Sequence, residues 1–239
     1  MKLIADLHTH TIASGHAYGT IRENAAAAKE AGLEILGITE HGPGIPGAPD
    51  LIYFRNLEAV PRYLSGVRVL LGCEMNILND GTVDLTEKEL ERIDFGIAGI
   101  HRFCFTDQGK EKNTDAVISA MKYEKVKIIS HPDDDHTPLD YDRLTDAAKE
   151  YHTALELNNS SLRKPQNRWN CEENYRVMLR YCMEKRVPVI IDSDAHDPSQ
   201  VADQALAIRF AEECGLDEEL VLNTDRKRLL EFLNIPDKK

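Results

Sequence analysis

The sequence predicts an α/β domain in which parallel strands alternate with helices, and two observations lead to this prediction. Short apolar runs recur about every 31 residues, the length of one strand–helix unit, and a polar turn and a helical pattern follow each run. The two most apolar runs, residues 67–72 and 187–191, do not alternate with polar residues, as expected of strands buried on both faces of a parallel sheet. Because no linker rich in Pro, Gly or Ser interrupts the pattern, we expect residues 1–239 to form a single domain.

Each predicted strand is a short apolar run, and the predicted helices occupy segments between or after these runs. In chain order, strands are expected at residues 3–6, 35–39, 68–73, 95–100, 127–130, 154–157 and 189–191. Helices are expected at residues 21–31, 87–91, 114–123, 141–152, 172–185, 199–214 and 226–233. Thr20 and Glu23 have the spacing of a capping box before the first helix, and Gly32 stands where a helix C-terminal glycine belongs.

The charge balance excludes two classes of partner. Lys and Arg together number 29, and Asp and Glu number 41, which gives a formal net charge of −12. A protein that coats nucleic acid or binds an anionic membrane surface needs a cationic face, so this balance weighs against both. The hydrophobic content of 42% is typical of a folded globular domain and is too high for a disordered chain.

Neither a targeting segment nor a cysteine framework is expected. No apolar run approaches the roughly 18 residues of a membrane-spanning helix, and an acid and two histidines follow the first few residues before an apolar signal core could form. The chain has five cysteines, an odd number, which are widely spaced and include no Cys-x-x-Cys pair. This pattern argues against a disulfide framework and against a thiolate zinc site. We therefore expect a soluble, cytoplasmic protein.

Polar side chains of a few types stand just past the end of every predicted strand. In chain order they are His8 and His10, His41, Glu74, His101, His131, Asn158 and Asn159, and Asp194 and His196. His16 lies in the loop after the first strand. Because a parallel barrel gathers the C-terminal ends of its strands on one face, we expect these residues to meet in one pocket.

The histidines and carboxylates of this set are typical metal ligands. Imidazole is the commonest metal ligand, and carboxylates such as Glu74 and Asp194 can bridge two cations. His8 and His10 are two residues apart at a strand end, so both point to one face, and Asp194 and His196 repeat that spacing. Eight or nine nitrogen and oxygen ligands are too many for one tetrahedral zinc and suit two or three ions of zinc, manganese or iron.

Basic residues near the strand ends are candidates for binding a substrate phosphate. Arg102 stands just after a strand end, and a guanidinium binds phosphate through two hydrogen bonds. Arg163, Lys164 and Arg168 follow another strand end and are candidates for a rim that receives an anion. For each of them the alternative is an ordinary surface ion pair or a solvated loop.

These motifs resemble, in the same order, those of the PHP (polymerase and histidinol phosphatase) family. They are DLHTH at 6–10, TEHG at 39–42, Glu74, IH at 100–101, SHP at 130–132 and SDAH at 193–196. The stretches 8–20 and 155–161 are similar to the small stand-alone bacterial phosphatases of the YcdX type. The resemblance implies a distorted TIM-like (β/α)7 barrel of parallel strands with a site for three divalent metal ions, usually zinc.

The resemblance also implies which residues hold which metal. The first metal would be held by His8, His10, Glu74 and Asp194, the second by Glu74, His101 and His131, and the third by His16, His41 and His196. Among these ligands, Glu74, Asp194 and His196 are assigned as catalytic. Two departures from the family pattern are Glu40, where many members carry aspartate, and the loop 133–136, which lacks an expected glycine. They are expected to affect the support of the ligands and the choice of substrate, respectively.

The predicted function is a metal-dependent phosphatase that hydrolyses a small phosphomonoester through a metal-activated hydroxide. A PHP-type phosphodiesterase or exonuclease is the alternative within the same chemistry, and the net charge weighs against it. An amidohydrolase acting on a C–N bond is less favoured because no lysine stands at a strand end, and a non-catalytic PHP module would have lost ligands. The predicted partner is a small phosphorylated substrate, with no membrane and with nucleic acid disfavoured, and the oligomeric state is left open.

Overall fold

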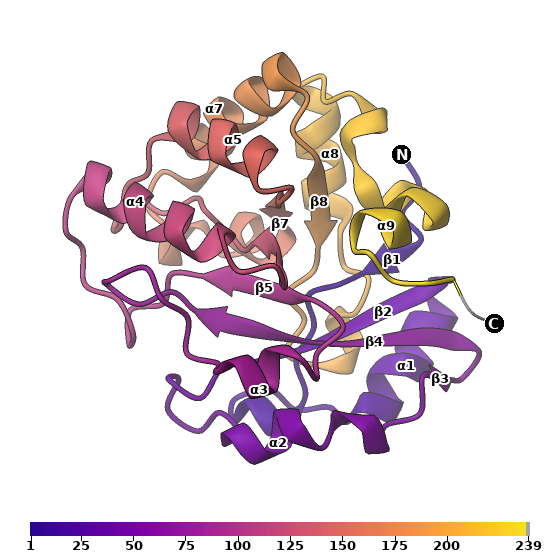
Figure 1. Ribbon diagram of the computed structural model, residues 1–239. Coiled ribbons are helices and arrows are strands. Elements are labelled where there is room, and N and C mark those ends of the chain that lie inside the picture. The colour runs from indigo at the N-terminus through magenta and orange to yellow at the C-terminus, as the bar shows by residue number, and fades with distance from the viewer. Residues whose placement is uncertain (238–239) are drawn as a thin grey trace.

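The apolar runs form seven parallel strands that curl into a nearly closed barrel (Figure 1), as seen in the computed structural model, which describes residues 1–237. The strands lie side by side in the order β1-β2-β4-β5-β6-β7-β8. Their bounds are Ala5–Asp6 (β1), Ile35–His41 (β2), Val67–Asn76 (β4), Gly96–Gly99 (β5), Val126–Ile129 (β6), Ala154–Asn158 (β7) and Val189–Asp192 (β8). The two outermost strands meet just past their ends, where Thr9 pairs with Ala195. The predicted parallel barrel is confirmed.

Helices surround this barrel (Figure 1). They are Ile21–Glu30 (α1), Leu51–Arg55 (α2), Glu87–Leu90 (α3), Lys110–Met121 (α4), Tyr141–Glu150 (α5), Asn159–Arg163 (α6), Cys171–Lys185 (α7), Ala205–Glu213 (α8) and Arg226–Phe232 (α9). The predicted capping box begins α1, because Glu23 N donates to Thr20 Oγ1 and Thr20 N donates to the Glu23 carboxylate at 2.8 Å. Among residues 1–237, no helix combines the length and the apolar character needed to cross a membrane.

The helix predicted at 199–214 is wrong over its first six residues, 199–204. Pro198–Gln200 form a 3-10 turn, and α8 begins only at Ala205. Between them Ala202 has a φ of +64°, and its N–H donates to Asp6 Oδ2 at 2.9 Å. The segment is therefore hydrogen-bonded to Asp6, the last residue of β1, and does not form the first turns of the predicted helix.

Three short elements are absent from the sequence-based prediction. The strand β3 (Tyr63–Leu64) pairs antiparallel with β4, and the short helices α2 and α6 lie in segments that we expected to be loops. In addition, α4 begins four residues before the predicted start, and β2 and β4 extend beyond their predicted ends to His41 and Asn76. The predicted ligand His41 therefore lies on β2 and the predicted ligand Glu74 lies on β4, both within regular β-structure.

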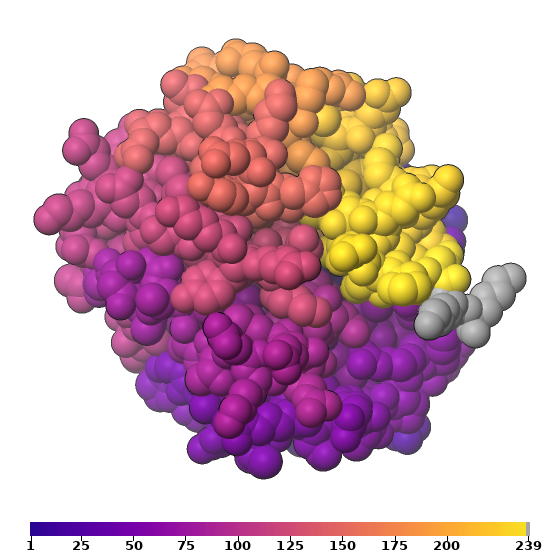
Figure 2. All heavy atoms as spheres, in the orientation of Figure 1, coloured from indigo at the N-terminus to yellow at the C-terminus, as the bar shows by residue number. Residues whose placement is uncertain are grey.

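Alternation along the strands separates an inner from an outer apolar cluster. The inner cluster takes one or more side chains from each of the seven strands and adds residues of α9, among them Ala5, Ile35, Leu70, Ile97, Ile128, Ala154, Ile190 and Leu229. Because α9 packs on the residues where the strands begin, it closes that end of the barrel. Figure 2 shows the C-terminal segment (yellow) packed against earlier parts of the chain. Inward-facing polar residues therefore gather at the opposite end, where the strands finish.

Candidate metal centre

Glu74 lies at the centre of the cluster of predicted ligands. It is on β4 at the inward-facing register of Leu70, and it is fully buried. Its Oε1 lies 2.9 Å from His131 Nε2 and 3.2 Å from His101 Nε2. Its Oε2 lies 2.8 Å from His41 Nδ1 and 3.3 Å from His8 Nε2. His10 Nε2 lies 3.5 Å from the same Oε2, so one carboxylate faces five imidazoles from four different strand ends.

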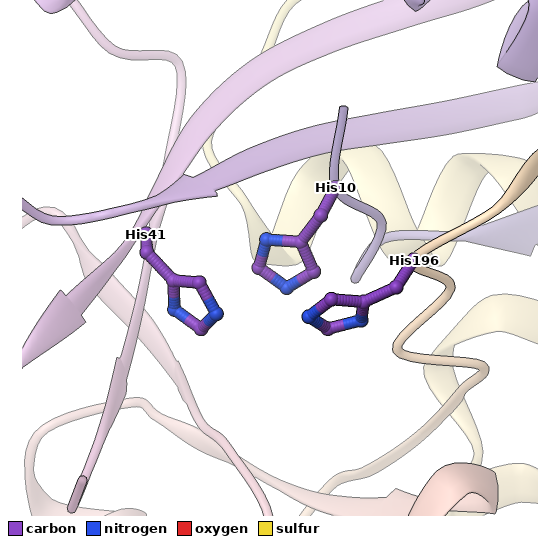
Figure 3. Close-up of side chains that lie close together, drawn as sticks. All are labelled: His10, His41 and His196. Atoms are coloured by element: carbon purple, nitrogen blue, oxygen red, sulfur yellow. The ribbon is translucent and has the colours of Figure 1, made fainter. Parts of the chain in front are cut away.

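A second carboxylate, Asp194, extends the cluster toward the last strand. Its Oδ1 lies 3.4 Å from His10 Nε2 and 3.5 Å from His8 Nε2. His196, two residues later, places its Nε2 3.2 Å from the Nε2 of His16. Figure 3 shows His10, His41 and His196 turned toward a common space, although they come from three separate segments. All nine predicted ligands therefore lie in one continuous cluster.

The donor atoms of this cluster fit cations. The Nε2 atoms of His8 and His10 are 3.1 Å apart, and two such lone pairs repel unless a proton or a cation lies between them. Within residues 1–237, the buried atoms without a partner in hydrogen-bond geometry include His41 Nδ1, Glu74 Oε2 and His101 Nε2, although the first two are 2.8 Å apart. Buried polar atoms are rarely left in this state, so their convergence fits a site that binds cations. Nitrogen and carboxylate oxygen donors without thiolate suit zinc, manganese or iron.

Three compact groups of donors stand out by distance alone. They are His8, His10 and Asp194; His41, Glu74 and His101; and His10, His41 and His196, each with ligand atoms within 4.8 Å of one another. These groups share members, so they form one cluster and not three isolated sites. His16 and His131 extend it through the contacts with His196 and Glu74.

The ligand histidines are oriented through the ring nitrogen that faces away from the cluster. His8 Nδ1 lies 2.7 Å from Glu156 Oε1, and His101 Nδ1 lies 2.8 Å from Asn76 Oδ1. An acceptor at Nδ1 holds the proton on that nitrogen and leaves the Nε2 lone pair free for a metal. Glu156 also accepts from the backbone N–H of His131 at 2.7 Å, so one buried carboxylate positions two ligands.

Glu40 supports His10 through a serine. The Ser14 hydroxyl donates to Glu40 Oε2 at 2.5 Å and lies 3.1 Å from His10 Nδ1. The same carboxylate accepts from Thr11 Oγ1 and from the Thr11 backbone N–H. Glu40 therefore orients His10 and fixes the loop after β1, which is the support of the ligands that we expected it to affect.

The charges within the cluster set its protonation. Burial lowers the pKa of His8, but neighbouring carboxylates, Glu74 foremost, outweigh burial and raise that pKa well above its ordinary value. Burial and the neighbouring His41 lower the pKa of His10 well below its ordinary value. Burial opposes ionisation of Glu74 and Asp194, yet the histidines around them, His8 foremost, lower the pKa of both carboxyls. The carboxylates and His10 thus have the protonation that metal ligands need, and a cation must displace a proton at His8.

Two of the ligands sit on strained backbone. His131 has a φ of +31° and Asp194 a φ of +54°, in the left-handed region that side chains other than glycine rarely adopt. Both residues follow directly after a barrel strand ends, and the turn in the chain aims their side chains into the cluster. Such strain is typical of functional sites and is maintained by the surrounding contacts.

A cavity of about 890 Å³ opens above the cluster. Its walls include the ligands His16, His41, His101, Asp194 and His196. Of the basic residues singled out from the sequence, Arg102, Lys164 and Arg168 line it. Arg163 does not, because its guanidinium is bound to Asp203 at 2.7 Å and to Gln200 at 3.2 Å. The structure therefore favours the ion-pair alternative for Arg163.

Sequence reasoning did not identify three residues that support the ligands: Glu156, Asn76 and Ser14. Glu156 carries a signal in its strand, since Ala154, Glu156 and Asn158 share one face of β7 and Ala154 belongs to the inner cluster. An acid at that register has to find a partner inside the barrel. Ser14 carries no comparable signal, because its role depends on how the loop after β1 folds back on Glu40.

Comparisons with known proteins agree with this geometry. A family model described as the PHP domain matches residues 6–162. A protein of Thermoanaerobacter sp. (strain X514) described as a probable phosphatase is 42% identical over 235 residues, which cover 98% of this chain and 95% of that protein. One from Clostridium acetobutylicum with the same description is 38% identical and covers 100% of this chain and 97% of its own.

Among solved structures, histidinol phosphate phosphatase from Lactococcus lactis, crystallised with zinc, L-histidinol and phosphate, has a similar fold. It matches with a TM-score of 0.62 at 17% identity, over 89% of this chain and 94% of that one. At this identity the likeness shows the barrel architecture alone.

Proposed function

The chain belongs to the PHP domain family and is a phosphatase, and we propose that it uses three divalent cations, with zinc as the first candidate, to hydrolyse a small phosphomonoester. We also propose that residues 1–239 act as a single domain. The observation that carries the proposal is the arrangement of five imidazoles from four strand ends around the buried carboxylate of Glu74. The zinc and phosphate in the Lactococcus lactis phosphatase add support from a protein of the same fold.

The proposed ligand sets follow the order of the motifs. The first is His8, His10, Glu74 and Asp194; the second is Glu74, His101 and His131; and the third is His16, His41 and His196. Within the sets, the histidine–carboxylate contacts are 3.3–3.5 Å in the first and 2.9–3.2 Å in the second, and His16 and His196 of the third are 3.2 Å apart. His41 of the third set also lies 2.8 Å from Glu74, so it links the third set to the other two. Glu74 belongs to two sets, which gives it the most demanding role in the centre.

Divalent cations bound here would supply Lewis acidity, which activates water at neutral pH and neutralises the charge of a phosphoryl group. The chain's own contribution is orientation and charge. Glu156, Asn76 and the Glu40–Ser14 pair hold the imidazoles so that their lone pairs face the centre. We assign Glu74, Asp194 and His196 as the catalytic residues, because Asp194 and His196 line the cavity and the buried Glu74 contacts His41 and His101 of its wall.

Substrate phosphate would be bound by the basic residues of the cavity wall. One nitrogen of the Arg168 guanidinium is held by the protein, because Nη1 lies 3.4 Å from Asp133 Oδ1 and 3.5 Å from the His131 carbonyl oxygen. These contacts are long and use one nitrogen of a group with five donors, so the guanidinium has donors left for an anion. Lys164 and Arg102 line the same cavity. These three basic side chains beside the metal centre favour an anionic substrate over the neutral amide that an amidohydrolase cleaves.

The test is phosphate release by protein whose metals have been removed with a chelator and then restored. We expect no turnover of p-nitrophenyl phosphate by the stripped protein, recovery with zinc, manganese or iron, and about three metals bound per chain at saturation. Faster hydrolysis of bis(p-nitrophenyl) phosphate would show a phosphodiesterase instead. Turnover that is unaffected by stripping, or absent with all three metals, would contradict the proposal, and a stoichiometry of two would contradict its trinuclear part.

A further inference from the structure

Two aromatic side chains, Tyr18 and Phe103, line the cavity above the cluster and yet remain exposed to solvent. Tyr18 is 77% exposed and Phe103 is 60% exposed. They come from different loops, since Tyr18 follows β1 and Phe103 follows β5. Neither ring contributes to the apolar core, so their packing inside the fold does not explain why large apolar groups stand at this place.

The backbone and a neighbouring charge hold these two rings near the metal ligands. Tyr18 N donates to the carbonyl of His196 at 2.8 Å, which ties the tyrosine to a ligand of the cluster. Phe103 lies two residues after His101, and the guanidinium of Arg102 sits 5.1 Å from the centre of its ring. Such a cation–π contact orients an exposed ring and leaves its remaining surface available.

The size of the cavity leaves room for more than a phosphate. A volume of about 890 Å³ lies near the upper end of the range of about 300–1,000 Å³ for sites that bury a drug-sized ligand. A phosphate has only one phosphorus and its oxygens, so most of this space faces the leaving group of the ester. Exposed aromatic rings on the walls of such a space are suited to stacking against a planar group.

Resting on the proposed function, we infer that this phosphatase selects phosphomonoesters whose leaving group carries a planar aromatic ring, which stacks on Tyr18 and Phe103. The phosphate would face the metal centre and the basic residues, and the ring would lie at the outer part of the cavity. Nucleoside monophosphates have this chemistry, because an aromatic base and a phosphate are joined through a sugar of intermediate length.

The experiment compares adenosine 5′-monophosphate with ribose 5-phosphate, which differ only in the base. With the zinc-loaded enzyme we expect a higher kcat/KM for the nucleotide, and about a tenfold fall in the ratio of the two kcat/KM values in the double variant Tyr18→Ala/Phe103→Ala. That fall is the size expected when a base loses an aromatic stacking partner. Tyr63→Ala, on β3 beside the beginning of β4, is the matched control and should leave the ratio unchanged.

A second readout concerns the ring alone. Adenosine lacks the phosphate, so its inhibition of ribose 5-phosphate hydrolysis measures binding of the base, and its inhibition constant should rise about tenfold in the double variant. A wild-type ratio near one, or a ratio and an inhibition constant that the double variant leaves unchanged, would overturn the inference and leave the proposed function standing. If neither these substrates nor p-nitrophenyl phosphate is hydrolysed with any metal, the proposed function itself fails and the inference fails with it.

Discussion

Glu156 offers a sharp test of how this barrel prepares its metal ligands. The carboxylate is fully buried and accepts three hydrogen bonds, from His8 Nδ1 at 2.7 Å, from the His131 backbone N–H at 2.7 Å and from Asn158 Nδ2 at 3.1 Å. In the variant Glu156→Gln the shape is kept, but one of the two oxygens becomes an NH2 group. Because all three partners are donors, at least one of them then faces another donor.

The consequence falls on His8. If the amide oxygen stays with His131 and Asn158, which share Glu156 Oε2, the new NH2 group faces His8 Nδ1. The imidazole then moves its proton to Nε2, and that proton occupies the lone pair with which the ring would bind a metal. Loss of such an outer contact lowers metal affinity or activity by roughly 10–100-fold, which corresponds to about 1.4–2.7 kcal/mol.

The assay is a zinc titration against a chromophoric chelator, together with kcat/KM for p-nitrophenyl phosphate. We expect Glu156→Gln to bind at least one zinc about 10–100-fold more weakly and to lose activity at limiting zinc, with partial recovery when zinc is in excess. Glu30→Gln, at an exposed position on α1, is the control that removes one negative charge from the surface. Wild-type zinc affinity in Glu156→Gln would refute the role assigned to this carboxylate.

Three further predictions address the centre and the barrel that carries it. Because two ligand sets share Glu74, the variant Glu74→Ala should bind fewer metals per chain. It should also lose more activity than the roughly 10–100-fold expected for Glu156→Gln. Full metal content by elemental analysis would contradict the assignment. Gly37→Ala should lower the free energy of unfolding by about 1–3 kcal/mol in urea titrations, since an added Cβ would lie 2.4 Å from the Leu7 carbonyl oxygen, and an unchanged midpoint would argue against so close an approach. Burial raises the pKa of Asp6 from 3.8 to about 6, so the folded protein binds more protons than the unfolded chain between these values and loses stability as the pH rises through them. Relative to Asp6→Asn, metal-free wild type should therefore lose about 3 kcal/mol between pH 4 and pH 7, and parallel stability curves for the two proteins would contradict this.

The strand ends were predictable because the signal is local. Each apolar run and the polar residue after it can be read within a few positions of sequence, and the barrel then brings the ends together. This reasoning placed His8, His41, Glu74, His101 and His131 correctly at one end of the barrel. It required only the direction of the strands and not the details of their packing.

Features that depend on distant contacts could not be predicted in this way. The break before α8 depends on the bond from Ala202 N to Asp6, which are 196 positions apart. Arg163 ends α6 and Arg168 follows five residues later, and they differ because Asp203, 40 positions after Arg163 in the chain, binds the guanidinium of Arg163. In both cases the local pattern allows two outcomes, and a partner far along the chain decides between them.

We propose that nine side chains from the strand ends and the loop after β1 hold three cations around the space where phosphate is cleaved. The most direct measurement is a crystal structure of the zinc-loaded protein with inorganic phosphate, using anomalous scattering at the zinc edge. We predict three anomalous peaks: one among His8, His10, Glu74 and Asp194, one among Glu74, His101 and His131, and one among His16, His41 and His196. Phosphate should lie against them on the cavity side. A map with fewer than three peaks in this cluster would contradict the trinuclear proposal, and one with no peak there, or with zinc bound only elsewhere on the protein, would contradict the metal centre itself.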